Sequence, residues 1–201
     1  MKLILLTKST FFVEEDKIIS TLFEEGLDNL HLYKPGTEPI YSERLLTLLS
    51  DDYYNKITVH DFYYLKEEYQ LRGIHIDSAD KQLPLRYKGH VSRTCDRIDQ
   101  LKEAKKSSDY VFLRNTFGNI HLQEPATSTI EELKAAAHQG LIDKKVYALG
   151  GINIDTIRMA KDLGFGGVVV CSDVWNRFDI HHELNYKELI QHFDRLKKAV
   201  R

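Results

Sequence analysis

The feature that most constrains this chain is a repeated alternation between short apolar runs and longer segments with the periodicity of an amphipathic helix. The apolar runs predict strands at 3–6, 29–33, 56–60, 73–76, 87–92, 109–113, 146–149 and 167–171. The other segments predict helices at 16–26, 42–49, 62–71, 96–106, 129–139, 153–163 and 186–200. Such alternation favours parallel strands joined by right-handed crossovers, and eight strands are the number that closes a barrel. The sequence therefore predicts a single (β/α)8 barrel, the TIM-barrel fold, over residues 1–201.

The main alternative is an open, doubly wound sheet of about five or six strands. It would hold if the weak runs at 73–76 and 87–92 were not strands. The 201 residues allow roughly 25 per unit, which is short for a barrel. No internal repeat, low-complexity segment or domain boundary offers another interpretation, so we expect one domain.

The balance of charge gives no reason to expect nucleic acid or an anionic membrane as a partner. The chain has 28 Lys and Arg against 30 Asp and Glu, a formal net charge of -2, and its basic residues are scattered. No apolar run approaches the roughly 18 residues that a membrane helix needs. The 2 cysteines, Cys95 and Cys171, are too few for a disulfide scaffold, so we expect reduced thiols in a cytoplasmic protein. A homo-oligomer is compatible with the sequence.

A glycine pair follows the seventh expected strand. Gly150 and Gly151 would let the backbone approach an anion closely, and the helix expected to begin near Asn153 would point free N–H groups at the same spot. Ser172 follows the eighth strand at another expected helix start. Loops after strands seven and eight are the usual phosphate site of such barrels. The sequence therefore predicts a phosphorylated ligand here, although the pair also fits a tight turn alone.

Carboxylates follow two neighbouring expected strands. Asp61 comes after the third strand, and Asp77 and Asp80 come after the fourth. Carboxylates from neighbouring strand ends could share a Mg2+ ion bound to a substrate diphosphate. Alternatively, they are solvated loop residues, with Asp80 capping a turn.

Histidine and basic side chains supply further candidates. His31 and His75 lie within expected strands, where a hydrogen-bonded core or pocket residue is more common than a catalyst. Lys34, Arg93 and Arg114 follow the second, fifth and sixth strands. Each could face an anion, and each could equally be a solvated surface charge.

Several of these segments resemble motifs of one known family. Residues 146–152 resemble its A-x-GGI loop, and residues 164–172 resemble its G-x-x-G-V-x-V-x-S strand. Residues 73–76, followed by Asp80, resemble its G-V-H-L strand and the Asp after it. Residues 90–92 resemble its G-x-S loop, and residues 109–111 resemble its D-Y-V strand. The family is thiamine phosphate synthase, with its relative the thiazole tautomerase, and the resemblance covers nearly the whole chain.

The resemblance implies a transferase that joins hydroxymethylpyrimidine diphosphate to thiazole phosphate and releases diphosphate. A departing diphosphate needs positive charge arranged in advance, which a metal and basic side chains supply. The implied roles are Asp61 and Asp80 as Mg2+ ligands, Ser92 near the leaving diphosphate, and Gly150, Gly151 and Ser172 as the binders of the thiazole phosphate. We add Lys34 and Arg114 to the catalytic group, and His31, His60 and His75 to the substrate pocket.

The diphosphate half of the implied site departs from the family pattern, whereas the phosphate half matches it. Lys34 is shifted from the family's Arg and Lys after the second strand. His60 and Phe62 replace the Asn and Arg on either side of the implied metal ligand, and Ser78 replaces a Gln. The family's Lys after the sixth strand has no counterpart in 115–121. The basic side chains that could compensate are Lys34, Arg93 and Arg114.

Two other functions fit an intact phosphate half. The tautomerase branch acts on thiazole phosphate without metal or pyrimidine. Thr94 stands where that branch has a His, so its general base would have to come from elsewhere, with His121 and His60 as candidates. The other function is that of a paralogue that binds a phosphorylated ligand without turnover.

Overall fold

The computed structural model describes residues 1–79, 81–118, 125–177 and 187–201. The strands are β1 (Lys2–Leu6), β2 (Leu30–Leu32), β3 (Ile57–Val59), β4 (Gly73–Ile76), β5 (His90–Cys95), β6 (Tyr110–Leu113), β7 (Val146–Leu149) and β8 (Gly167–Val170). The helices are α1 (Glu15–Glu24), α2 (Pro39–Leu48), α3 (Tyr64–Glu68), α4 (Leu101–Ala104), α5 (Ile130–His138), α6 (Ile154–Asp162), α7 (Ser172–Trp175) and α8 (Lys187–Val200). Short 3-10 helices span Asp51–Lys56 and Ile98–Gln100.

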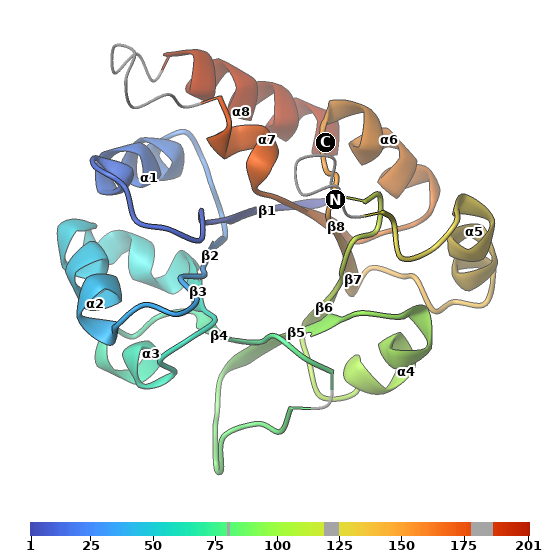
Figure 1. Cartoon of the computed structure of the whole chain (residues 1–201), viewed down its shortest axis with the longest axis horizontal. Coiled ribbons are helices and arrows are strands. Elements are labelled where there is room, and N and C mark those ends of the chain that lie inside the picture. The colour runs from blue at the N-terminus through green and yellow to red at the C-terminus, as the bar shows by residue number, and fades with distance from the viewer. Residues whose placement is uncertain (80, 119–124, 178–186) are drawn as a thin grey trace.

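The strands of the described residues close into a parallel barrel. They pair in chain order from β1 to β8, and β8 pairs back to β1 (Figure 1). Helices surround this ring on its outside (Figure 1). The closed order confirms the predicted (β/α)8 barrel and excludes the open, doubly wound sheet.

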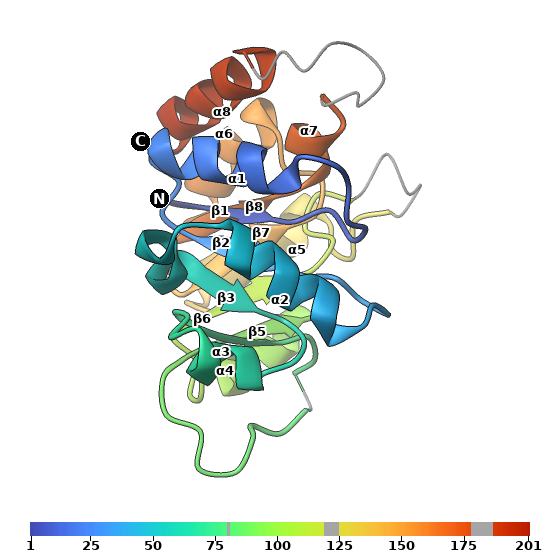
Figure 2. The same ribbon diagram turned by 90° about the vertical axis from the view of Figure 1, so that its left-hand side faces the viewer.

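The long helices cover the barrel because each carries one apolar stripe. The stripes of α1 and α8 bury Ile18, Ile19, Leu22, Leu189, Phe193 and Leu196. α8 contacts α1, α6 and β1, so the last helix lies over the seam where β8 meets β1 (Figure 2). In the described ranges, no helix is both long enough and apolar enough to span a membrane.

The barrel interior mixes apolar and polar side chains. Ile4, Phe112 and Val169 belong to a small buried cluster that is separate from the main core. His31 and His75 are fully buried, and both rings lie within 5 Å of the Phe112 ring, at 4.9 and 4.6 Å between centroids. Strand side chains alternate between the two faces of a sheet, so polar residues on β2, β4 and β5 can meet inside the barrel.

The fifth strand differs from the prediction. β5 begins at His90, whereas the sequence predicted a start at Tyr87. Ser92 and Thr94 concealed the strand because they are polar, and both hydrogen-bond His75 inside the barrel. Ser92 therefore lies in the middle of β5, and the prediction that the strand ends there was wrong.

The start of α2 also differs. The sequence predicted a helix over 42–49, but α2 begins at Pro39 and buries Ser42 in its first turn. Proline suits the first helical position because its fixed φ is helical and its missing N–H would have no partner there.

Candidate active site

A cavity of about 520 Å3 opens at the carboxyl ends of the strands. Barrel enzymes bind their ligands at this end, because the loops that follow the strands converge there. The predicted site residues that line it are His60, Arg114, Gly150, Gly151 and Ser172.

Gly150 and Gly151 form one wall of the cavity, with φ of 101° and 67°. A Cβ on Gly150 would lie 2.7 Å from Asn115 Cα, and a Cβ on Gly151 would lie 2.5 Å from Gly118 O. The close approach of the loop after β6 therefore requires glycine at both positions, in a backbone conformation that other residues rarely adopt. The tight-turn interpretation holds, and the same turn presents this backbone to the cavity.

The first turn of α6 does not offer all of its N–H groups to a ligand. Asn153 caps the helix as predicted, and its Oδ1 accepts hydrogen bonds from the N–H groups of Asp155 and Thr156 at 2.9 and 3.0 Å. The prediction that these groups are free for an anion was therefore wrong. Anion binding on this side would rest on the backbone of 150–152 and on Ser172, which begins α7.

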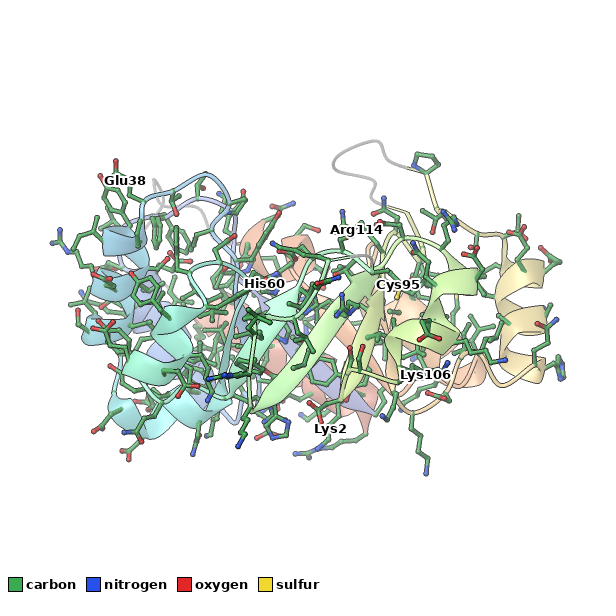
Figure 3. All side chains as sticks on the ribbon, turned by 90° about the horizontal axis from the view of Figure 1, so that it is seen from below. Lys2, Glu38, His60, Cys95, Lys106 and Arg114 are labelled. Carbon is green, nitrogen blue, oxygen red and sulfur yellow. The ribbon has the colours of Figure 1, made fainter. Side chains whose placement is uncertain are left out.

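Arg114 is the predicted basic residue that reaches the cavity. Its Nη2 donates to Asp77 O at 3.1 Å, and its Nε lies 3.3 Å from Asp96 Oδ1. The side chain is 43% exposed, so it can still turn a donor toward a ligand. Figure 3 shows Arg114 at the end of the barrel opposite to Lys2, which begins β1.

Lys34 is buried in an ion pair and is not among the residues that line the cavity. Its Nζ lies 2.6 Å from Glu15 Oε1, and both side chains are at most 2% exposed. Burial lowers the pKa of Lys34 and raises the pKa of Glu15, while their mutual attraction opposes both shifts. The ammonium group that the sequence assigned to catalysis is therefore engaged with a carboxylate inside the protein.

Arg93 and Ser92 are also not among the residues that line the cavity. Arg93 is buried, and its Nη1 donates to the carbonyls of Ser78 and Ala79 at 3.0 and 3.1 Å, which fixes the loop after β4. Ser92 Oγ lies 2.7 Å from His75 Nδ1. Of the three basic residues expected to compensate in the diphosphate half, Arg114 is therefore the one that the structure places at the cavity.

A chain of hydrogen bonds crosses the barrel interior and ends in the cavity. We call it the imidazole column, and it consists of Tyr110, His31, His60 and Asp77. Tyr110 Oη lies 2.8 Å from His31 Nε2, His31 Nδ1 lies 2.8 Å from His60 Nε2, and His60 Nδ1 lies 2.7 Å from Asp77 Oδ1. Burial, followed by the neighbouring His60, holds the pKa of His31 well below its usual value, so this imidazole is neutral.

The three histidines do not form a good site for a transition metal. Among the described residues, His31, His60 and His75 bring ligand atoms within 4.8 Å of one another. However, the His60 and His75 rings are stacked, with centroids 4.1 Å apart and planes at 20°, so they cannot point lone pairs at one ion in their own planes. The nitrogens of all three rings also have hydrogen-bond partners.

The carboxylates offer a better fit, for a hard cation. Asp61 Oδ2 is buried and has no hydrogen-bond partner in the described part of the chain. Burial and, next, the Asp77 carboxylate raise the pKa of Asp61. A divalent cation would relieve both penalties, and Mg2+ prefers oxygen ligands. The other predicted metal ligand, Asp80, lies outside the described residues.

Several cavity residues were missed from the sequence. Lys8 and Tyr33 line the cavity directly after β1 and β2, and Trp175 lines it from α7, with its Nε1 donating to Leu6 O at 2.7 Å. For Lys8 and Tyr33, the position after a strand was a usable signal, because such residues face the open end of a barrel. Trp175 belongs to α7, whose start after the eighth strand was expected, but the sequence assigned no role to this residue.

Known proteins resemble this chain in sequence and in structure. The sequence profile of thiamine monophosphate synthase matches residues 43–174. A crystal structure of thiamine phosphate pyrophosphorylase from Bacteroides thetaiotaomicron has 50% sequence identity and a TM-score of 0.88, over 99% of this chain and 97% of that chain. A comparison with curated proteins found no match.

More distant structures share the fold. Thiamine phosphate pyrophosphorylase from Pyrococcus furiosus has 18% identity and a TM-score of 0.74, over 99% of this chain and 95% of that chain. A mutant tryptophan synthase alpha-subunit from the same organism has 15% identity and a TM-score of 0.68, over 98% and 97%. The 50% identical relative and the profile match identify the family as well as the fold. The chain belongs to the thiamine monophosphate synthase family.

Proposed function

We propose that the protein is a transferase that joins hydroxymethylpyrimidine diphosphate to thiazole phosphate, forming thiamine phosphate and releasing diphosphate. The observation that carries this proposal is a cavity with two chemically different walls. After β7 and β8 the wall consists of the glycine pair and Ser172, and after β4 and β6 it contains Asp77 and Arg114. In the closed ring β4 lies opposite β8, so Asp77 and Ser172 follow strands on opposite sides of the cavity, and Arg114, which follows β6, lies between Asp77 and the glycine pair. This spread of groups allows two different phosphorylated ligands to bind in one cavity.

Each wall has a separate task. Gly150, Gly151 and Ser172 would hold the thiazole phosphate through backbone N–H and hydroxyl donors. Arg114 would supply positive charge beside the diphosphate of the pyrimidine substrate. Asp61, with Asp80 as the resemblance implies, would hold Mg2+, which when bound neutralises charge that builds up on the leaving diphosphate.

Two residues that the sequence assigned to catalysis contribute, in this proposal, by positioning. Ser92 holds the His75 ring inside the barrel. Lys34 supplies a backbone N–H to the Asp61 carboxylate, while its ammonium group fixes the segment after β2 to Glu15 at the start of α1. Neither side chain needs to touch a substrate for these roles.

The proposal is tested by one incubation of the protein with both substrates, with and without Mg2+, read for thiamine phosphate. We expect product only with Mg2+, and we expect Asp61→Ala to abolish it. No product under either condition would reject the transferase. Thermal stabilisation by thiazole phosphate without turnover would instead identify a binding protein.

A tautomerase is less well supported by the geometry. Its reaction needs a base with a free lone pair in the cavity. Both ring nitrogens of His60 already have partners, Thr94 Oγ1 hydrogen-bonds His75, and His121 lies outside the described residues. Cys95 and Cys171 form no disulfide within the described residues, which agrees with a cytoplasmic location for the proposed transferase.

A further inference from the structure

We propose that Asp77 is an additional ligand of the divalent cation in this site, and that the imidazole column holds its carboxylate in place for that purpose. The inference rests on the proposed function, because it concerns the cation that the transferase would use. It goes beyond it because the resemblance implies only Asp61 and Asp80 as ligands, and the sequence offered Asp77 as one of several loop carboxylates without a reason to prefer it.

The first argument is the charge of Asp77 in a cavity for anions. Its side chain is 33% exposed and lines the cavity, and Oδ1 is engaged with His60. Within the described residues, Oδ2 has no hydrogen-bond partner. A bare carboxylate repels a diphosphate, whereas a cation between the two groups converts that repulsion into attraction on both sides.

The second argument is the neighbouring carboxylate. β3 and β4 pair directly, with Val59 opposite Ile74, so Asp61 and Asp77 follow adjacent strands at the same end of the barrel. Asp61 Oδ2 is buried and has no hydrogen-bond partner among the described residues. Two carboxylates on adjacent strands, each with an unbonded oxygen, supply the type of ligand that Mg2+ and Mn2+ prefer.

The third argument is the direction of the imidazole column. An ionised carboxylate only accepts hydrogen bonds, so His60 Nδ1 must donate to Asp77 and His60 Nε2 must accept. His31 Nδ1 then donates to His60, and His31 Nε2 accepts from the Tyr110 hydroxyl. Tyr110 Oη in turn accepts from Asn29 Nδ2 at 3.0 Å. Every donor in the column therefore points toward the cavity, and one arrangement of protons satisfies all of its members.

This arrangement fixes Asp77 as the acceptor at the end of the column. Oδ1 is held by His60, which leaves Oδ2 oriented by the same restraint and available to a cation. Outer partners of this kind typically change metal affinity by about 10–100-fold when they are removed. This chain has His60 where the family pattern has Asn. The arrangement gives a physical reason for the difference, because the Asp77 carboxylate needs a hydrogen-bond donor at position 60.

The test uses Mn2+ as the probe and electron paramagnetic resonance to count bound ions, on the whole protein with and without inorganic pyrophosphate. We expect Asp77→Asn to raise the Mn2+ dissociation constant at least about tenfold. The matched control is Asp99→Asn, a surface carboxylate paired with Arg97, which should leave Mn2+ binding unchanged. Unchanged binding in Asp77→Asn overturns the proposal, and so does a wild-type protein that binds no Mn2+ in the presence of pyrophosphate.

The column has its own pair of variants. Tyr110→Phe removes the hydroxyl that donates to His31, and it should weaken Mn2+ binding several-fold although this hydroxyl is remote from the cavity. Tyr147→Phe is the control, because its ring stacks on Tyr110 at 4.8 Å and no hydrogen bond of its hydroxyl is seen in the described residues. Equal Mn2+ affinity in these two variants, at equal melting temperatures, rejects the positioning role of the column.

The outcomes separate this inference from the proposed function. If the wild type makes thiamine phosphate but Asp77→Asn keeps its Mn2+ affinity, only the role of Asp77 fails. If Mn2+ binds through Asp77 but no thiamine phosphate forms, only the transferase fails.

Discussion

At position 150, the backbone and a neighbouring loop both require glycine. The φ of Gly150 is 101°, and the space that a Cβ would occupy is filled by Asn115 Cα. Gly164, which ends α6, has a φ of 81° but nothing within 4 Å of the corresponding point. Alanine substitutions at these two positions can therefore be compared to separate the cost of an unfavourable backbone conformation from the cost of a steric clash.

Gly150→Ala should destabilise the protein more than Gly164→Ala. Gly164→Ala should lower the free energy of unfolding by about 1–2 kcal/mol, the usual penalty of a side chain in the left-handed region. Gly150→Ala should lower it by about a further 1–3 kcal/mol, because the loop after β6 must move. Urea denaturation of both variants measures the difference, and equal values would show that the loop yields freely.

Some features of individual residues could be predicted from the sequence, and others could not. The cap at Asn153 follows from local chemistry, and the structure has it. His31 and His75 could be placed in strands, but their meeting with His60 depends on the register of three separate strands. Ser92 was misplaced because polar side chains inside a barrel imitate a loop, so periodicity alone could not find the end of β5.

At the scale of elements, the pair of Lys34 and Glu15 joins the segment after β2 to the start of α1. Lys34 Nζ also donates to Thr10 O at 3.1 Å and lies 4.4 Å from the centre of the Phe11 ring. The loop between β1 and α1 is thus held by one buried cation. A buried pair is poor evidence for added stability, but the removal of one partner leaves an uncompensated charge.

Lys34→Met should lower the free energy of unfolding at neutral pH by about 3–5 kcal/mol. The control Lys17→Met removes an exposed partner of Glu14 and should change it by less than about 0.5 kcal/mol. Melting temperatures of both variants and the wild type measure these effects. A loss in Lys34→Met no larger than in the control would contradict the role of the pair.

The loss of stability in the Lys34→Met variant should also depend on pH. Burial raises the pKa of Glu15 above its ordinary value of 4.5, and the loss of Lys34 raises it further. Ionised Glu15 therefore destabilises the folded variant fully above that raised pKa. The penalty declines as pH falls from there to 4.5 and disappears below 4.5, where the carboxyl is protonated in both states. The gap in melting temperature between variant and wild type should narrow over that range. A gap that is constant with pH would assign the loss to packing.

At the scale of the whole molecule, the barrel is closed by the pairing of β1 with β8, and α8 covers that seam. The Met1 amino group donates to Val200 O at 2.8 Å, so both ends of the chain meet at the end of the barrel opposite to the cavity. The alternation of elements was sufficient to predict this architecture, because eight parallel strands joined by seven crossovers of one hand leave few other arrangements.

Phe193→Ala in α8 should test whether the closed barrel unfolds as one unit. Phe193 is fully buried, so its truncation should lower the free energy of unfolding by about 3–5 kcal/mol, while Lys198→Ala on the exposed face of α8 should have little effect. The chain has 1 Trp, Trp175, beside the cavity, and its fluorescence should report the same urea midpoint as circular dichroism of all helices. Separate midpoints would show that α8 detaches before the barrel opens.

The loop that carries Arg114 is attached directly to the glycine wall. The N–H groups of Thr116 and Phe117 donate to the carbonyls of Leu149 and Gly150 at 2.9 and 3.2 Å. A phosphate seated on the glycine side would therefore restrain the backbone that carries the guanidinium on the other side. The two substrates of the proposed reaction would then bind with thermodynamic synergy, each tightening the affinity for the other, because they share one short segment of main chain.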